Sequence, residues 1–236
     1  MRFRVFPDET AWIEAARGDF ESVVARSRAE GRVLELVLAG GTSPESVYRS
    51  LAAGRLRGLP SRLWLGDERA VGAADPARNG ILITRCFSAA DWEPKADQRS
   101  WPTGEVSGAV AYYASELLSA FGRRPSFDLA FLGVGSDGHT AGLFPGDPGS
   151  LAALDPSSEE LAFATTAPTE PRLRMSLGAA CLAGSRVIRF LTVGKAKREI
   201  LERLMSDEGR LLPARLVAEV AEARGTDVAF YHFEGG

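Results

Sequence analysis

Val33–Ala53 reads VLELVLAGGTSPESVYRSLAA and contains, in order, the patterns of a strand, a turn and a helix. The apolar run Val33–Ala39 is typical of a buried strand. The glycine and hydroxyl residues of Gly40–Ser43 indicate a tight turn. Pro44–Ala53 has the spacing of a short helix, with Gly54 where a C-cap belongs. A strand that passes through a short turn into a helix is the repeating unit of an α/β fold.

The turn in this unit has the features of an anion-binding loop. Gly40 and Gly41 let the backbone approach a ligand closely. Ser43 is expected to be the N-cap of the helix and Pro44 its first residue. The free N–H groups at a helix start attract phosphate, and the hydroxyl of Thr42 adds a further donor. The Gly-Lys-Ser/Thr ending of a Walker loop is missing, and an ordinary capped turn is the alternative.

Strand and helix patterns alternate along the rest of the chain. This alternation favours a single α/β domain over residues 1–236, with a mostly parallel sheet covered by helices on both faces. Residues 72–103 are expected to be rich in loops, with a weak helix around 78–85. The remaining strands are expected at Arg2–Phe6, Leu63–Leu65, Phe127–Leu132, Leu161–Thr165, Val187–Val193 and Asp227–Phe233, and the remaining helices at Thr10–Glu30, Gly104–Phe121 and Lys195–Met205.

Composition narrows the class of protein. The chain has 236 residues, a formal net charge of −3 and a pI of about 5.6, and this acidic balance argues against a nucleic-acid partner. No apolar run approaches the roughly 18 residues of a membrane helix, and the first residues lack a signal-peptide core, so a cytoplasmic protein is expected. Cys86 and Cys181 are expected to stay reduced, and no His/Cys spacing indicates a metal site.

Ligands of parallel sheets bind beyond the carboxyl ends of the strands. The loops 40–43, 66–71 and 133–146 each follow an expected strand. We therefore expect them to meet at one site.

The third of these loops carries a candidate general base. Gly133–Gly138 matches G-x-G-x-x-G, but glycines and a proline after it prevent the long helix of a dinucleotide site. His139 is instead well placed for acid–base chemistry, and Asp137 or another carboxylate could orient its imidazole. A solvent-exposed histidine is the alternative. His232, inside the last expected strand, is expected to be structural.

Charged residues after other strands supply candidate anion contacts. Asp67 and Arg69 lie in the sequence GDER, where the carboxylate could position a hydroxyl or a proton and the guanidinium could stabilise an oxyanion. Arg174 and Lys195 are further candidate anion ligands. A solvated turn with a local ion pair is the alternative for GDER, and surface charges are the alternative for the other two.

Taken together, these segments resemble the 6-phosphogluconolactonase family, within the superfamily that also contains glucosamine-6-phosphate deaminase. The most specific stretch is DGHTAGLFPG, because deaminases share DGHIA and then diverge. Gly142 stands where the family usually has serine, and Gly80-Ile81 follows Asn79 where a tyrosine is common. The matching segments are LAGGTSP (38–44), WLGDERAV (64–71), Asn79, DLAFLGVGSDGHTAGLFPG (128–146), RMS (174–176), FLTVGK (190–195) and LPA (212–214).

The resemblance implies a modified Rossmann-like three-layer sandwich that hydrolyses 6-phospho-D-glucono-1,5-lactone without a metal or an organic cofactor. It implies that His139 is the base, that Arg69 stabilises the oxyanion and that Asp67 or Asp137 assists. The implied ligands of the phosphosugar are Gly40, Gly41, Thr42, Ser43, Asn79, Arg174 and Lys195. The alternatives are a deaminase acting on amino-sugar phosphates and a non-catalytic sugar-phosphate binder. The sequence does not indicate an oligomeric state.

Overall fold

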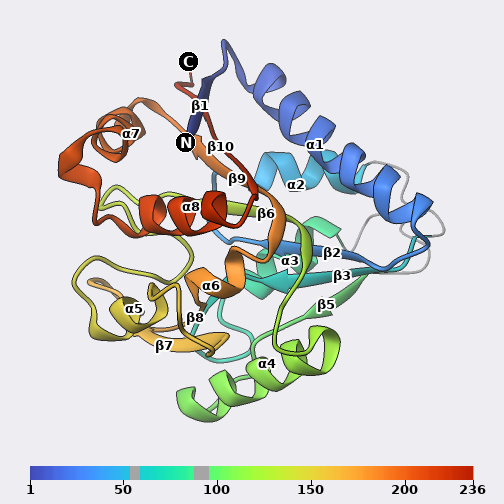
Figure 1. The fold of residues 1–236 in the computed structure, drawn as a ribbon, viewed down its shortest axis with the longest axis vertical. Helices are drawn as coiled ribbons and strands as arrows, with labels where there is room; N and C mark the ends of the chain where they lie inside the picture. The colour runs from blue at the N-terminus through green and yellow to red at the C-terminus, as the bar shows by residue number, and fades with distance from the viewer. Residues whose placement is uncertain (54–58, 88–95, 236) are drawn as a thin grey trace.

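A computed structural model describes residues 1–53, 59–87 and 96–235. Its main feature is a seven-stranded sheet in the order β1-β10-β9-β6-β2-β3-β5, and every neighbouring pair in it is parallel (Figure 1). The expected parallel α/β fold is therefore confirmed. The strands of this sheet are β1 (Arg2–Val5), β2 (Leu34–Leu38), β3 (Ser61–Leu65), β5 (Asp97–Arg99), β6 (Phe127–Gly133), β9 (Ser185–Val193) and β10 (Asp227–Phe233).

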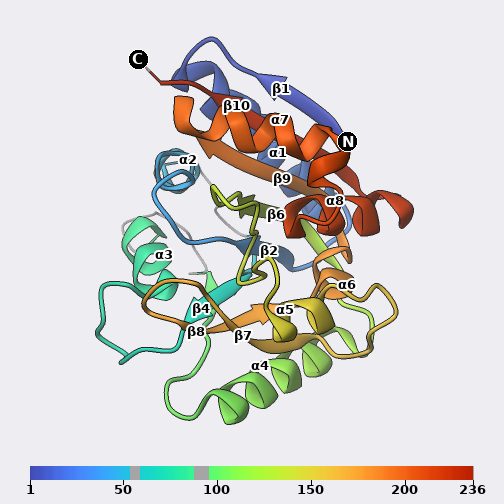
Figure 2. The same cartoon turned by 90° about the vertical axis from the view of Figure 1, so that its left-hand side faces the viewer.

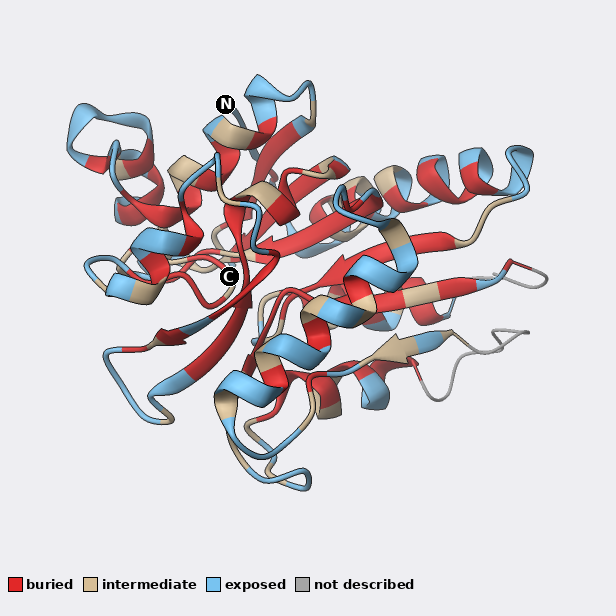
Figure 3. Cartoon of the chain, turned by 60° about the horizontal axis from the view of Figure 1, so that its bottom comes forward, coloured by how far each residue is buried: buried red, intermediate tan, exposed pale blue. Residues whose placement is uncertain are grey.

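Helices cover both faces of the large sheet. Helix α1 packs across β2, β6 and β10, while α8 packs on β10 and on α6, and Figure 1 shows α1 and α8 on opposite sides. Figure 3 shows that the buried positions gather in the strands and on the helix faces turned toward them. The helices are α1 (Glu9–Ala29), α2 (Glu45–Ala52), α3 (Asn79–Phe87), α4 (Val106–Phe121), α5 (Pro148–Ala153), α6 (Ala179–Leu182), α7 (Arg198–Met205) and α8 (Pro213–Ala223), with 3-10 turns at Lys195–Lys197 and Asp207–Gly209.

The core is formed by the apolar side chains whose periodic spacing in the sequence predicts that they are buried. In α1, Trp12, Ala16 and Phe20 recur every four residues and are at most 3% exposed. In β2 all five residues are buried, which is typical of a central parallel strand. None of the helices in the described ranges is both long and apolar enough to cross a membrane. Cys86 and Cys181 are buried free thiols.

A second, three-stranded antiparallel sheet has the order β4-β8-β7 and lies beside α4 and α5 (Figure 2). Its strands are β4 (Asp67–Arg69), β8 (Leu173–Leu177) and β7 (Ala162–Thr166). The sequence predicted β7 but interpreted Gly66–Arg69 as a charged turn, and this interpretation is wrong. The three residues DER form a strand because β8 pairs with them, and that partner lies far along the chain.

Two local predictions also need correction. Helix α2 begins at Glu45 with Pro44 as its N-cap, and no side chain caps it, so Ser43 is not the N-cap. The expected helix Lys195–Met205 is split, because Gly194 has φ +96° and leads into a 3-10 turn before α7 begins at Arg198. The expected C-cap Gly54 lies outside the described residues.

Candidate active site

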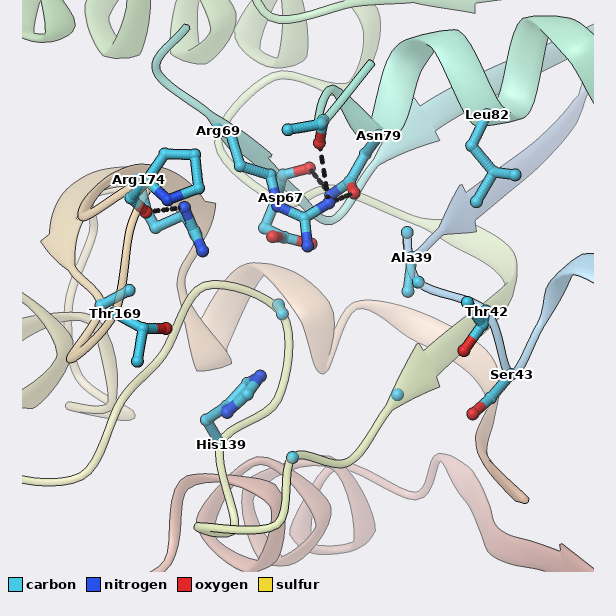
Figure 4. A pocket seen from close by; sticks show the side chains of 18 of the residues that line it. Ala39, Thr42, Ser43, Asp67, Arg69, Asn79, Leu82, His139, Thr169 and Arg174 are labelled. Carbon is cyan, nitrogen blue, oxygen red and sulfur yellow. Dashed lines mark hydrogen bonds between the residues drawn. The ribbon is translucent and has the colours of Figure 1, made fainter. Parts of the chain in front are cut away.

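The three expected loops line one cavity of about 840 Å³ at the carboxyl edge of the large sheet. Residues 39–45 follow β2, Asp67 and Arg69 follow β3, and residues 133–137 with His139 follow β6. Residues 76–79 at the start of α3, Leu82 and Arg85 within it, and residues 167–171 before β8 complete the wall. Figure 4 shows side chains from these elements pointing toward a common space. The expected convergence of the loops is confirmed.

His139 and Asp137 form a hydrogen-bonded pair in this wall. Nδ1 of His139 lies 2.6 Å from Oδ1 of Asp137, which also accepts the His139 backbone N–H at 3.1 Å. Burial alone would raise the pKa of Asp137, but the hydrogen bonds and charge of His139 lower it. An ionised Asp137 only accepts hydrogen bonds, so Nδ1 of His139 carries the proton. In the neutral imidazole this arrangement leaves the lone pair on Nε2, as a general base requires.

The backbone of the β6 loop is shaped around this pair. Gly135 donates its N–H to the His139 carbonyl at 2.8 Å and accepts from Gly138 at 3.0 Å, and Gly138 has φ +85°. A side chain at Gly135 would meet Nδ1 of His139 at 2.0 Å and Oδ1 of Asp137 at 2.5 Å. The loop continues to Gly146 without opening a helix, and α5 begins only at Pro148. The glycines of this stretch therefore shape the loop that carries His139 and do not form a dinucleotide-binding turn.

The loop after β2 presents unused hydrogen-bond donors to the cavity. Among the described residues, none accepts a hydrogen bond from the backbone N–H of Gly41, Thr42 or Ser43, nor from their side-chain hydroxyls. Thr42 and Ser43 lie at one side of the pocket in Figure 4. Free N–H groups ahead of a helix start are suited to binding a phosphate.

Asp67, Arg69 and Asn79 form a second part of the wall. Asn79 donates through Nδ2 to the Asp67 carbonyl at 2.9 Å, and its Oδ1 accepts a hydrogen bond from Arg69. Arg69 also donates to the Ala77 carbonyl at 3.2 Å. Asp67 as a residue is 7% exposed, yet its carboxylate makes no hydrogen bond or ion pair with a described residue. It is therefore free to accept a hydrogen bond from a ligand.

Arg174 lies beside Arg69. The two residues are opposite each other in the pairing of β4 with β8, and Arg174 donates to the Pro171 carbonyl. Burial and repulsion from Arg69 lower the pKa of the Arg174 guanidinium. Figure 4 shows Arg174 and the loop residues Thr42 and Ser43 on opposite sides of the pocket. Neither arginine forms an ion pair within 4 Å among the described residues, although the charges of Asp67, Glu68 and Glu170 partly offset that of Arg174.

The lysine of this cavity is Lys197, which the sequence analysis did not select. Its Nζ donates to the Val134 carbonyl at 2.8 Å, and burial lowers its pKa against the opposing pull of Asp137. Lys195 is exposed and does not line the cavity, although it lies in the same 3-10 turn as Lys197. The sequence does show a second lysine three residues after Gly194, the glycine that follows β9.

Over the described ranges, no group of three or more His, Cys, Asp or Glu side chains is arranged to hold a metal ion. His232, expected to be structural, is buried in β10 outside this cavity.

Residues 7–226 match the family described as glucosamine-6-phosphate isomerases/6-phosphogluconolactonase. The chain belongs to this family. Its expected resemblance to the lactonase branch is supported by a Streptomyces coelicolor 6-phosphogluconolactonase, which is 30% identical over 94% of this chain and 87% of its own. A solved 6-phosphogluconolactonase from Shewanella baltica superposes with a TM-score of 0.84 at 26% identity, covering 99% of this chain and 97% of that one.

Another relative is a longer protein. The human GDH/6PGL endoplasmic bifunctional protein is 32% identical over 84% of this chain. The chain spans about a quarter of the length of this protein and of its rabbit counterpart, namely 26% and 27%.

Proposed function

We propose that this chain hydrolyses 6-phospho-D-glucono-1,5-lactone to 6-phospho-D-gluconate, the hydrolytic step of the oxidative pentose phosphate pathway. The observation that carries the proposal is the His139–Asp137 pair, whose imidazole lines a cavity together with Arg69, Arg174 and an unused donor loop. A phosphorylated lactone matches this cavity because it bears one anion from the start and forms a second at C1 during hydrolysis. The names of the relatives support the same reaction.

His139 acts first as a base and then as an acid. Its Nε2 takes a proton from a water molecule while the water oxygen bonds to C1 of the lactone. The tetrahedral intermediate then expels the ring oxygen, which receives the proton from Nε2 of His139 and becomes the C5 hydroxyl. Asp137 holds the imidazole in the required tautomer and stabilises the cation that forms between the two steps.

Positive groups on two sides of the cavity stabilise the two anions. Arg69, held by Asn79, stabilises the C1 oxyanion, and Arg174 lies beside it. The Gly40–Ser43 loop binds the 6-phosphate through backbone N–H groups and hydroxyls. Lys197 takes the phosphate role expected of Lys195, because it is held at Val134, next to the strand pair β2 and β6. Asp67 accepts a hydrogen bond from a sugar hydroxyl.

The isomerase reaction of the same family is the second candidate, and the unpartnered Asp67 carboxylate favours it. In that reaction Asp67 would act as a base on a carbon acid, and His139 would open the sugar ring. Ammonia release from glucosamine 6-phosphate distinguishes this activity from lactone hydrolysis.

The deciding experiment supplies lactone made by oxidation of glucose 6-phosphate and follows the appearance of 6-phosphogluconate. The spontaneous rate without protein is subtracted, because the lactone also opens by itself. We expect the wild-type chain to accelerate the reaction and His139→Ala to lose about 10²–10⁴-fold of that acceleration.

Each other outcome removes a specific part of the proposal. Equal rates for wild type and His139→Ala would keep the lactonase and remove His139 as its base. No acceleration by folded wild type, together with ammonia release from glucosamine 6-phosphate, would assign the isomerase reaction. Binding of 6-phosphogluconate without either activity would indicate a sugar-phosphate binder.

A further inference from the structure

We propose that Glu68 is a positioning residue that holds Arg69 and Asn79 in the catalytic geometry. The inference rests on the proposed function, because it assigns the support of the oxyanion-stabilising arginine. Glu68 is fully buried in β4, between the cavity residues Asp67 and Arg69, and does not itself line the cavity. It therefore acts on the reaction through its neighbours.

The Glu68 carboxylate accepts hydrogen bonds from the backbone N–H groups of both Arg69 and Asn79. Its Oε1 accepts the N–H of Arg69 at 2.8 Å and the N–H of Asn79 at 2.7 Å. Its Oε2 accepts the N–H of Gly80 at 2.9 Å, and Nε of Arg78 lies 3.6 Å away. Burial raises the pKa of Glu68, while these hydrogen bonds and Arg78 favour its ionised form. One buried carboxylate thus joins β4 to the start of α3.

This arrangement answers a structural need at the helix start. Helix α3 begins at Asn79, so the N–H groups of Asn79 and Gly80 have no partner inside the helix. Glu68 supplies the missing acceptor from another element, and its negative charge suits the positive end of the helix. Removing it would leave buried donors unsatisfied and release the helix start from β4.

Asn79 links Glu68 to the residues that line the cavity. Its side chain accepts a hydrogen bond from Arg69 and donates to the Asp67 carbonyl, so backbone and side chain are both fixed. A Cβ at Gly40 would lie 1.6 Å from Oδ1 of Asn79, which shows that Asn79 lies directly against the Gly40–Ser43 loop. Glu68 therefore sets the position of Arg69 relative to both ends of the substrate.

The test uses Glu68→Gln, which keeps the size of the side chain and replaces one acceptor oxygen by an amide that donates. In either orientation of the amide, its NH2 group faces backbone N–H groups, and two donors cannot form a hydrogen bond with each other. We expect kcat for the lactone to fall by about 10- to 100-fold, because a small displacement of a catalytic group has effects of this size. In the Arg69→Ala background the same change should cost less than about threefold, because the residue that Glu68 positions is already gone.

Glu35→Gln is the matched control. Glu35 is also a buried glutamate, 5% exposed, and accepts hydrogen bonds from Arg62 and Trp64 at 2.7 Å, away from the cavity. It should lower the unfolding midpoint but leave kcat unchanged, and its effects should be independent of Arg69→Ala. If Glu68→Gln fails to fold, Asn79→Ala tests the same link, because it leaves Glu68 satisfied and releases Arg69.

The role of Glu68 is overturned if folded Glu68→Gln keeps kcat within twofold of wild type, or if its loss multiplies fully with that of Arg69→Ala. Asn79→Ala with an unchanged kcat overturns it as well. Failure of the proposed function looks different, because then wild type itself shows no lactonase rate. In that case the affinity for 6-phosphogluconate is compared instead: Glu68→Gln should weaken it and Glu35→Gln should not, and equal affinities overturn the positioning role.

Discussion

Arg69 and Arg174 are directly opposite each other in an antiparallel strand pair. Like charges in this position destabilise a sheet, and the burial of Arg174 strengthens their repulsion. The lowered pKa of Arg174 reflects burial first and the charge of Arg69 second. Such an unfavourable pair is compensated when an anion binds between or beside the two guanidinium groups. At the scale of single residues, this pair supports the proposal that the cavity binds an anionic ligand.

The two lysines near Gly194 provide a prediction at the same scale. Lys197→Met removes the charge held at the Val134 carbonyl and keeps most of the side-chain volume. Because a remote phosphate contact contributes uniform binding, we expect KM for the lactone to rise about tenfold or more with little change in kcat. Lys195→Met is the control, since Lys195 is exposed outside the cavity, and it should leave both constants unchanged. A larger effect from Lys195→Met would contradict the assignment of Lys197 to the phosphate.

At the scale of elements, β2, β3 and β6 of the large sheet are each followed by residues that line the cavity at the same edge. The loop after β6 depends most on its glycines, because the His139–Asp137 pair fills the space beside Gly135. The short strand β4 depends on its pairing with β8, which turns Arg69 toward the cavity and Glu68 away from it. The alternation of side chains along a strand explains why adjacent residues have different roles.

Gly135→Ala tests the loop after β6. Its Cβ would lie 2.0 Å from Nδ1 of His139, so the imidazole must leave its hydrogen bond with Asp137. We expect the lactonase rate to fall by about 10²–10⁴-fold, as after loss of a positioned base. Gly72→Ala, where a Cβ meets nothing within 4 Å, should keep full activity. An active Gly135→Ala protein would show that the pair is not required in this geometry.

At the scale of the whole molecule, the two sheets and their helices share one continuous apolar core, within which some polar and charged side chains are also buried. His232 is one of them. Its Nδ1 lies 3.1 Å from the Thr192 hydroxyl, and its Nε2 has no hydrogen-bond partner in the described structure. Burial lowers the pKa of His232 below 6.5, against the hydrogen bond of Thr192 and the charge of Glu234. The neutral form of this imidazole is therefore the one that the core accepts.

This burial predicts a pH dependence of stability. Because the folded pKa of His232 is lowered, the unfolded chain binds more protons below about pH 6.5, and the contribution of His232 to stability is lost as the pH falls. We expect the free energy of unfolding in urea to fall more between pH 7.5 and pH 5.5 for wild type than for His232→Gln. Equal decreases for the two proteins would show that other groups carry the acid sensitivity.

Local patterns in the sequence were sufficient for most elements of the large sheet and for the meeting of its loops. Apolar periodicity and glycine or proline breaks act within a few residues, so they located β2, β6, β9 and α4 and placed the His139 loop at the carboxyl edge. The edge strand β5 was not predicted, because its three residues, Asp97–Arg99, carry no apolar pattern. The N-cap of α2 was predicted at Ser43, one residue too early, because the sequence pattern contains no tertiary information.

Only the tertiary structure decided the rest of the site. The pairing of β4 with β8 brings together Arg69 and Arg174, which are far apart in the chain, and no local pattern predicts a three-residue polar strand. Lys197 rather than Lys195 lines the cavity because its Nζ reaches the Val134 carbonyl after β6, a partner far away in the sequence. Glu68 can be buried because backbone N–H groups at the start of α3 donate hydrogen bonds to its carboxylate. Partners distant in sequence determine burial and charge compensation, so these features exist only once the chain has folded.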